Sequence, residues 1–293
     1  MTEGQIIKAL SGFYYVRAED TVYRCRGRGV FRKKGIHPLV GDYVNFDIND
    51  PNEGYITEVK PRKNELMRPP VANIDQAIIV SSSVKPEFNP LLLDRFLVLI
   101  EYKSIKPIIF ITKADAASTE EKKILEKYQK EYKQIGYHVE WFSTRDPKEI
   151  TYLFDLFKNK ISVVAGQSGV GKSSLLNALN PSLFIKTDDI SESLGRGKHT
   201  TRHVELVEVG DGLVADTPGF SSLDFNEINM QDLADCFPEM RSRKGKCKFR
   251  GCLHDREPKC AIKEAVELGK IKTYRYEHYL SFLNEIQSRK PRY

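Results

Sequence analysis

Cysteine is scarce in this sequence and long apolar runs are missing, and both shortages restrict what the protein can be. The five cysteines are an odd number, and the first residues, MTEGQIIKAL, show no basic start followed by a long apolar core, so we expect no signal peptide. We therefore expect reduced thiols and a cytoplasmic protein. No apolar run approaches the roughly 18 residues that a membrane-spanning helix needs, so we expect no membrane partner.

The rest of the composition is that of an ordinary globular protein. Hydrophobic residues make up 40% and charged residues 29% of the 293 positions, and this length suffices for two or three domains. The formal net charge of +6 permits a polyanionic partner without requiring one. What the charge means therefore depends on where it lies.

Residue patterns divide the chain into three regions, so the predicted fold is multidomain. Residues 1–68 alternate like short strands between turn residues, which favours a small β-barrel, and five strands would fit an OB-fold. Residues 69–225 alternate apolar strands with helical stretches, which indicates an α/β domain with a mostly parallel sheet covered on both faces. Residues 226–293 read as helical and basic. The segment 67–70, MRPP, is predicted to be a linker because two prolines end regular structure. The strand candidates are 14–16, 22–25, 43–46, 55–59, Gln76–Ser81, Pro107–Thr112, His138–Phe142, Ile161–Ala165, Val204–Val209 and Leu213–Asp216.

The clearest motif is a phosphate-binding loop. Residues 166–173, GQSGVGKS, match GxxxxGK[ST] at every fixed position, between a predicted strand and a predicted helix. In such a loop the backbone N–H groups and the helix amino terminus surround the phosphates, Lys172 reaches the β- and γ-phosphates, and the Ser173 hydroxyl binds Mg²⁺. The candidate nucleotide-binding residues are Gly166, Gln167, Ser168, Gly169, Val170, Gly171, Lys172, Ser173 and Ser174.

A second motif predicts which base is bound. Thr112, Lys113 and Asp115 belong to TKAD, which resembles the [NT]KxD box of GTPases. A carboxylate accepts two parallel hydrogen bonds from N1–H and the 2-amino group of guanine, and adenine offers neither donor there. The Lys113 stem can cover the face of the base. Ser143 and Thr144 follow another strand, where such proteins place a short loop over the guanine oxygen.

Two further segments have the composition of nucleotide-sensing switches. Asp216 and Gly219 belong to DTPG, which matches DxxG: the carboxylate would hold Mg²⁺ through water, and the glycine N–H would sense the γ-phosphate. The glycine-rich segment 195–201, GRGKHTT, fits a first switch in which Thr200 or Thr201 completes the Mg²⁺ shell. The sequence does not decide between these two threonines.

The order of the motifs is unusual. GTPases ordinarily run from the P-loop through the switches to the base box, but here the base box at 112–115 precedes the P-loop at 166–173. One sheet can still form, because chain ends often lie close together and permutation at exposed sites is tolerated. The sequence therefore predicts a circularly permuted GTPase in which the second switch leads almost directly into the carboxy-terminal region.

That carboxy-terminal region contains a candidate metal site and a basic run. Cys247, Cys252, His254 and Cys260 supply three thiolates and an imidazole within 14 residues, which suits one structural Zn²⁺ with tetrahedral coordination. The residues 241–250 carry six cations and no acid, and beside zinc, with Phe249 between cations, they favour contact with an RNA backbone over a merely solvated face. Cys25 and Cys236 lack such neighbours and are expected in the core. A second group of cations lies in the barrel region and consists of Arg24, Arg26, Arg28, Arg32, Lys33 and Lys34.

Together the OB-like region, the permuted motif order and C-x4-C-x-H-x5-C resemble the ribosome small-subunit-dependent GTPase A family (RsgA) of bacteria, over the whole chain. The resemblance implies late maturation of the 30S subunit: the subunit, with its 16S rRNA, stimulates GTP hydrolysis, and the protein checks the decoding region and releases an assembly factor. Phe220 follows DTPG where Ras-like proteins carry a water-orienting glutamine, and a phenyl ring cannot position water. The family uses a switch-one histidine, which here would be His199. We expect a monomer that binds GTP and GDP.

Three functions remain open on sequence alone. The first is a GTPase that is activated by the small ribosomal subunit. The second is a nucleotide-gated RNA-binding adaptor with negligible turnover, and the third is an ATPase with a degenerate base box. GTP turnover with and without subunits separates the first two, and competition by ATP tests the third.

Overall fold

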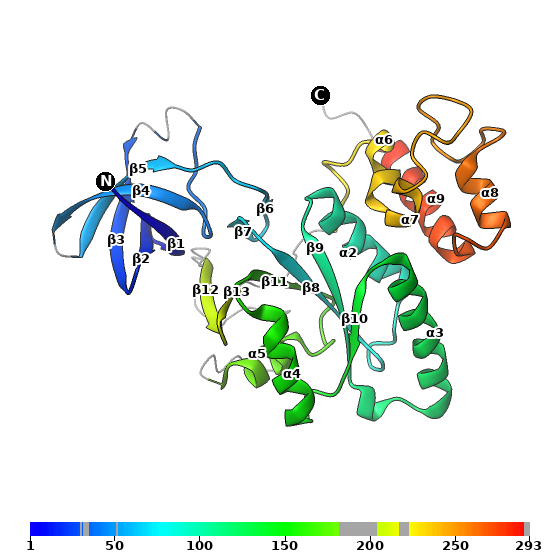
Figure 1. The fold of residues 1–293 in the computed structure, drawn as a ribbon, viewed down its shortest axis with the longest axis horizontal. Coiled ribbons are helices and arrows are strands. Elements are labelled where there is room, and N and C mark those ends of the chain that lie inside the picture. The colour runs from blue at the N-terminus through cyan, green and yellow to red at the C-terminus, as the bar shows by residue number, and fades with distance from the viewer. Residues whose placement is uncertain (30, 32–34, 51, 182–203, 217–222, 290–293) are drawn as a thin grey trace.

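The computed structural model describes residues 1–29, 31, 35–50, 52–181, 204–216 and 223–289, and it arranges them in three units. A β-barrel and a helical unit lie at opposite ends, and an α/β unit lies between them (Figure 1). His199, Thr200, Thr201, Gly219 and Phe220 lie outside the described residues.

The amino-terminal unit is a closed five-stranded barrel. Its strands are β1 (Thr2–Leu10), β2 (Phe13–Ala18), β3 (Thr21–Gly27), β4 (Tyr43–Asp50) and β5 (Glu53–Val59). They run in the order β1-β2-β3-β5-β4, and pairing of β1 with β4 closes the barrel. Alternate side chains fill the interior, among them Ile6, Val16, Cys25, Phe46 and Ile56. The predicted OB-type barrel is confirmed, although β1 was not among the predicted strands.

The predicted linker at 67–70 turned out to be structured. Strands β6 (Glu65–Met67) and β7 (Pro70–Ala72) form a two-stranded hairpin whose turn is this segment. Pro70 is tolerated because it opens a short strand, where a missing N–H donor costs little. The prediction of a linker was therefore wrong in its local structure.

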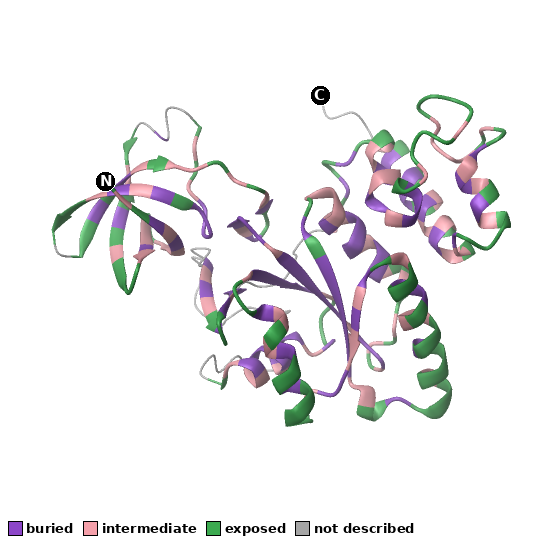
Figure 2. Ribbon diagram, in the orientation of Figure 1, coloured by how far each residue is buried: buried purple, intermediate pink, exposed green. Residues whose placement is uncertain are grey.

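The central unit is a mostly parallel sheet with helices on both faces. Its strands are β8 (Gln76–Ser82), β9 (Lys106–Thr112), β10 (His138–Trp141), β11 (Ile161–Ala165), β12 (Val204–Val209) and β13 (Gly212–Asp216), in the order β10-β9-β8-β11-β13-β12. Only the β12–β13 pairing is antiparallel within this part of the sheet. Figure 2 shows that its strands are largely buried, whereas α3 is exposed along its outer side.

Alternation along the buried strands assigns the helices to the two faces of the sheet. Ala77 and Ile79 share a core with α2 (Pro90–Tyr102) and α3 (Thr119–Ile135). Ile78 and Val80 share the other core with α4 (Pro147–Phe157) and α5 (Lys172–Leu179). Because the strand period is two, one apolar run serves both faces. The short 3-10 helix η1 (Ala114–Ala116) follows β9.

The barrel and the central unit share one continuous sheet. Strand β1 pairs antiparallel with β12, with Lys8 opposite Glu205 and Ala9 opposite Val204. An ion pair joins Lys8 to Glu205 at 2.9 Å. The barrel is therefore attached directly to the strand that begins just after the residues of the predicted first switch.

The carboxy-terminal unit consists of short helices around an aromatic core. They are α6 (Met230–Leu233), η3 (Ala234–Cys236), α7 (Pro238–Arg241), α8 (Ala261–Glu267) and α9 (Thr273–Gln287). Phe225, Phe237, Tyr279 and Phe282 fill the centre, and Val98 of α2 joins the same core. Cys236, like Cys25 of the barrel, is buried as expected.

A buried ionic network fixes this unit to the central one. Arg275 of α9 is only 1% exposed; its Nε donates to Glu239 Oε1 at 2.7 Å, and its guanidinium also donates to Asp94 of α2. The Tyr132 hydroxyl of α3 donates to Asp94 at 2.6 Å. A buried cation requires such partners, so breaking one would leave an uncompensated charge. Among the described residues, no helix is long and apolar enough to cross a membrane.

Candidate functional site

The phosphate-binding loop connects β11 to α5 through residues whose backbone needs glycine. Gly166, Gly169 and Gly171 have φ of +142°, +79° and +95°, conformations that side chains disfavour. A Cβ atom on Gly166 would also lie 2.2 Å from the Val80 carbonyl oxygen. The glycines of the motif are thus required by geometry, and the amino terminus of α5 faces the space that the loop encloses.

Lys172 lies buried inside this loop. Its Nζ donates to the carbonyl oxygens of Gly166 at 2.9 Å and Gln167 at 2.7 Å. Burial lowers the pKa of Lys172 to about 8. A bound phosphate would raise that pKa again, because a nearby anion favours the charged ammonium. Ser173 is buried beside Lys172 and Ser174 is half-buried, whereas Gln167, Ser168 and Gly169 are exposed.

The base box touches the phosphate loop directly. The buried Thr112 hydroxyl, at the end of β9, donates to the Val170 carbonyl at 2.6 Å. Lys113 adopts a left-handed conformation with φ of +60°, and its Nζ donates to the Gly169 carbonyl at 2.9 Å. Residues 58 and 56 positions apart in sequence are therefore joined into one site, as the two motifs together predict.

The second part of the predicted base site lies next to the first. Because β9 and β10 are parallel neighbours, the residues that follow them meet at one edge of the sheet. A hydrogen bond from Ser143 is the main cause that lowers the pKa of the exposed Asp115 carboxyl. Arg145 lies 3.4 Å from the same carboxylate, and Thr144 between them is half-buried. An ionised Asp115 is the acceptor that the two guanine donors need.

The switch residues are only partly described. Asp216 is the last residue of β13, which is parallel to β11, so its backbone lies at the same edge of the sheet as the P-loop. The other predicted switch residues, namely His199, Thr200, Thr201 and Gly219, lie outside the described residues. Their roles stay predictions.

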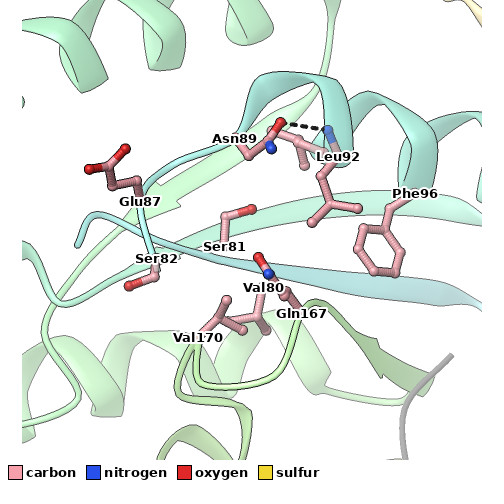
Figure 3. Close-up of a pocket in the computed structure, with 10 residues that line it drawn as sticks. Val80, Ser81, Ser82, Glu87, Asn89, Leu92, Phe96, Gln167 and Val170 are labelled. Carbon is pink, nitrogen blue, oxygen red and sulfur yellow. Dashed lines mark hydrogen bonds between the residues drawn. The ribbon is translucent and has the colours of Figure 1, made fainter. Parts of the chain in front are cut away.

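A small pocket adjoins the P-loop on the side of α2 (Figure 3). Gln167 and Val170 line it from the loop, and Leu92 and Phe96 line it from the helix. Asn89 caps the helix by accepting a hydrogen bond from Leu92 N at 3.0 Å. The pocket is lined by the P-loop but not by the base box, so it belongs to the phosphate side of the site.

The four predicted zinc ligands converge. Their ligand atoms all lie within 4.8 Å of one another. Cys247 Sγ is 3.9 Å from Cys260 Sγ and 3.5 Å from His254 Nδ1, and His254 Nδ1 is 3.3 Å from Cys260 Sγ. Tetrahedral zinc, with bonds of about 2.3 Å to sulfur and about 2.0 Å to nitrogen, places two sulfurs about 3.8 Å apart and a sulfur and a nitrogen about 3.5 Å apart. The donor set and its spacing therefore fit a closed zinc site.

The surroundings hold the cluster in this shape. The hydroxyls of Tyr276 and Tyr279 donate to the carbonyls of His254 and Leu253, each at 2.6 Å. Desolvation raises the pKa of the Cys252 thiol to about 12. A divalent cation would reverse that effect, because it stabilises thiolates directly.

The basic run at 241–250 divides into two parts. Three cations have partners: Arg241 donates to Glu101 at 2.8 Å, Arg243 donates to the Glu239 carbonyl, and Lys244 pairs with Asp235. Three further cations, Lys246, Lys248 and Arg250, are exposed and form no ion pair with any residue that the structure describes. The ammonium of Lys248 lies 5.5 Å from the centre of the exposed Phe249 ring. The exposed part of the run is thus a patch of free cations beside an aromatic ring.

The barrel carries a comparable surface. Arg24 and Arg26 lie over the Phe13 ring at 4.8 and 4.7 Å from its centre. Arg24 also pairs with Glu53, and Arg28 is 3.2 Å from Asp47, so two of these cations already have acidic partners. The other predicted cations of this group, Arg32, Lys33 and Lys34, lie outside the described residues.

Sequence reasoning missed two residues that support the base box. Ser83 donates from its hydroxyl to the Thr112 carbonyl at 2.7 Å, and Trp141 donates from its indole N–H to the Ser83 hydroxyl at 2.9 Å. The signal was present: polar residues that end buried parallel strands meet at the ligand-binding edge of the sheet. Trp141 is also the one tryptophan of the sequence.

A P-loop joined to a guanine-type box that precedes it in the chain defines the class of circularly permuted P-loop GTPases. Two family models match: RsgA GTPase over residues 59–226 and RsgA N-terminal domain over residues 3–56. The chain belongs to the RsgA family of GTPases and is a GTP hydrolase, as the resemblance predicted.

Relatives and solved structures agree with this assignment. The chain is 62% identical to small ribosomal subunit biogenesis GTPase RsgA 2 of Oceanobacillus iheyensis and 61% identical to the corresponding protein of Bacillus cytotoxicus, in each case over all of both chains. The crystal structure of YloQ, a circularly permuted GTPase, matches with a TM-score of 0.86 at 51% identity and covers 100% of this chain and 97% of that one. YjeQ from Thermotoga maritima matches with a TM-score of 0.86 at 34% identity over 99% of both chains.

Proposed function

We propose that this GTPase acts in late maturation of the small ribosomal subunit and that the subunit stimulates its GTP hydrolysis. The relatives of equal length bear the name of small ribosomal subunit biogenesis GTPases. The observation that carries the proposal is the contact of the base box with the P-loop, since Thr112 and Lys113 both donate to P-loop carbonyls. This contact forms a guanine-nucleotide site in the middle of the molecule.

Each part of that site has a role in the proposal. Asp115 binds N1–H and the 2-amino group of guanine, with Ser143 and Thr144 over its oxygen. Lys172 and the N–H groups of residues 166–174 hold the phosphates, and Ser173 and Asp216 hold Mg²⁺. Mg²⁺ supplies charge neutralisation on the β- and γ-phosphates when it is bound with GTP.

The proposed hydrolysis depends on residues of the two switches. Thr200 or Thr201 completes the Mg²⁺ shell, and the Gly219 N–H senses the γ-phosphate. His199 accepts a hydrogen bond from the attacking water and fixes its direction, because Phe220 cannot do so. Intrinsic hydrolysis is then slow until the subunit orders the segment.

Two separate cationic surfaces support an RNA partner. One lies on the barrel around Phe13, and the other lies around Phe249 in the carboxy-terminal unit, at the opposite end of the molecule (Figure 1). Arg24 and Arg26 lie over the Phe13 ring and Lys248 lies over the Phe249 ring, an arrangement that suits phosphates and unstacked bases. A large folded RNA such as 16S rRNA can meet both surfaces at once.

The zinc site has a structural role in this proposal. Cys247, Cys252, His254 and Cys260 offer no open coordination position, so one bound Zn²⁺ per chain would fix the loop that carries Lys248 and Phe249. We propose 1–68 for the barrel, 69–225 for the GTPase and 226–293 for the zinc-binding unit as the domain boundaries. We further infer a cytoplasmic monomer that contacts subunits and their assembly factors.

The test is GTP turnover by the purified chain with and without small ribosomal subunits. The proposal expects a large increase in kcat with small subunits and none with large subunits at equal concentration. Binding of subunits in the presence of GTP without faster turnover would favour the alternative, a nucleotide-gated RNA-binding adaptor. Equal competition by ATP and GTP would favour the third function, an ATPase, and would refute the guanine site.

A further inference from the structure

A chain of hydrogen bonds crosses the edge of the sheet where the base box begins. The Trp141 indole N–H donates to the Ser83 hydroxyl at 2.9 Å, and that hydroxyl donates to the Thr112 carbonyl at 2.7 Å. The Thr112 hydroxyl then donates to the Val170 carbonyl at 2.6 Å. We call these four residues the Trp141 relay. It links β10, the segment after β8, the base box and the P-loop.

The relay starts where the strand ladders end. The last ladder pair of β10 with β9 is Trp141 with Ile111, and the last pair of β8 with β9 is Ser82 with Thr112. Beyond these pairs single backbone hydrogen bonds continue, from Ser83 N to the Thr112 carbonyl and from Phe142 N to the Ile111 carbonyl, each at 3.0 Å. The side chains of the relay add to these bonds and connect them to the P-loop. Ser83 is only 4% exposed and uses its hydroxyl both as acceptor and as donor, which fixes the direction of the relay.

Both halves of the predicted base site closely follow a residue of this relay in the chain. Thr112 lies three residues before Asp115, and Trp141 lies two residues before Ser143. Asp115 is exposed, and its carboxylate accepts a hydrogen bond from Arg145 Nη1 at 3.4 Å, while Arg145 N donates to the Ser143 hydroxyl at 3.2 Å, so both loops meet at this side chain. A shift of either loop by a fraction of an ångström would therefore change how the carboxylate meets the two guanine donors.

We propose that Ser83 and Trp141 are positioning residues for guanine recognition. This proposal rests on the proposed guanine site. Neither residue contacts the nucleotide in it; they set the distance between the base box and the loop at 143–144. A residue that only packs the sheet and a residue that positions the base box would both lower thermal stability when mutated. Thermal stability therefore cannot distinguish a structural role from a positioning role. Discrimination between bases can, because it depends on where Asp115 lies.

The discriminating ligand is inosine diphosphate, which has N1–H but lacks the 2-amino group of guanine. In the wild-type chain GDP should bind more tightly than IDP, since Asp115 accepts one hydrogen bond more. Ser83→Ala should weaken GDP binding about fivefold, the effect of one lost buried hydrogen bond. The ratio of the Kd for IDP to the Kd for GDP should fall about twofold to threefold, because a misplaced carboxylate loses more with GDP.

Matched variants separate positioning from packing. Ser83→Thr keeps the hydroxyl, so this variant should have the wild-type Kd for GDP and the wild-type ratio of the two Kd values. Ser162→Ala removes another buried serine hydroxyl of the same sheet, which accepts from Gln76 Nε2 at 3.0 Å at the far end of β11 from the P-loop. It should lower the melting temperature and leave both binding constants unchanged. Trp141→Phe keeps the ring, removes only the N–H donor and should reduce the ratio in the same direction.

The measurements are calorimetric titrations with GDP and IDP, at a temperature where each variant gives the wild-type circular dichroism spectrum. The emission maximum of Trp141, the one tryptophan, reports the relay independently and should shift in Ser83→Ala but not in Ser162→Ala. Unchanged Kd values and an unchanged ratio in Ser83→Ala would overturn the proposal, and an unchanged ratio in Trp141→Phe would remove Trp141 from it. A wild-type chain that binds ADP as well as GDP would instead refute the proposed guanine site itself.

Discussion

Replacing Cys252 by serine removes one of the four converging ligands and leaves the others in place. Structural zinc in small domains contributes roughly 10–16 kcal/mol of apparent binding free energy. Shared among four ligands, this is about 3 kcal/mol for each, or about a hundredfold in zinc affinity. Apart from the cluster, the loop between Cys247 and Cys260 is joined to the helices by the hydroxyls of Tyr276 and Tyr279 and by Lys263, which donates to the Asp255 carbonyl. Its other hydrogen bonds, such as those from Leu253 N and Asp255 N to Glu257, lie within the loop itself. We therefore expect this loop to unfold first.

The loss should stay local. Arg275 holds α9 on α2 through Asp94 and on α7 through Glu239, and none of these residues belongs to the cluster. Elemental analysis of freshly purified protein should find one zinc per wild-type chain and much less in Cys252→Ser. Limited proteolysis should cut the variant within 247–260, while its Kd for GDP equals that of the wild type. Cys236→Ala, a change at a buried cysteine outside the cluster, is the matched control and should keep its zinc. Wild-type protein without zinc, or a variant that retains it fully, would refute the reasoning.

Three other predictions follow from the site and its surroundings. Asp115→Asn should weaken GTP binding about 10- to 100-fold and favour XTP, because the amide donates where xanthine accepts; unchanged selectivity in a competition assay would contradict the guanine box. Alanine at the three cations of 246–250 should weaken subunit binding and reduce the slope of log K against log salt by about three, one for each lost phosphate contact. Lys244→Ala is the control, since the charge of Lys244 already pairs with Asp235. An equal effect of the control and the triple variant would mean that the run is merely a solvated surface. His199→Ala should keep GTP and subunit affinity but lose roughly a hundredfold in stimulated kcat; full recovery at saturating subunits would leave it no catalytic role.

Local motifs explain why so much of the site was predictable. The P-loop, TKAD and the zinc-ligand spacing each lie within 14 residues, and each has residue types that its chemistry requires. The positive φ of Gly166 and its contact with Val80 show that the same glycines also satisfy backbone geometry. The alternation of buried strands with helices was equally informative, because each strand of a parallel sheet is apolar along its whole length.

Contacts between distant segments could not be predicted in this way. Trp141 and Ser83 are 58 residues apart, and Arg275 and Asp94 are 181 apart. The side chain of a serine after a strand or of an arginine in a helix can equally well point into solvent. Its partner is therefore known only from the packed structure. The prediction of a linker at 67–70 was wrong for a related reason. The two short strands of the hairpin at 65–72 stabilise each other, although the sequence of each strand alone predicts no regular structure.

The pairing of β1 with β12 gives the permuted order a physical consequence. β12 begins directly after the residues of the predicted first switch, and its first two residues pair with Lys8 and Ala9 of the barrel. β13 ends at Asp216, and the residues 217–225, which include the rest of the predicted second switch, lie between that strand and the carboxy-terminal unit. In the ordinary motif order the carboxy-terminal unit would not follow the second switch, because the base box would lie there. Here the predicted first switch precedes β12, which pairs with the barrel and thus supports its cationic surface. The predicted second switch precedes the carboxy-terminal unit, which carries the cations around Phe249. A change at the nucleotide therefore has a short route to both ends of the molecule, and RNA bound at either end has the same route back, because coupling between two sites is reciprocal.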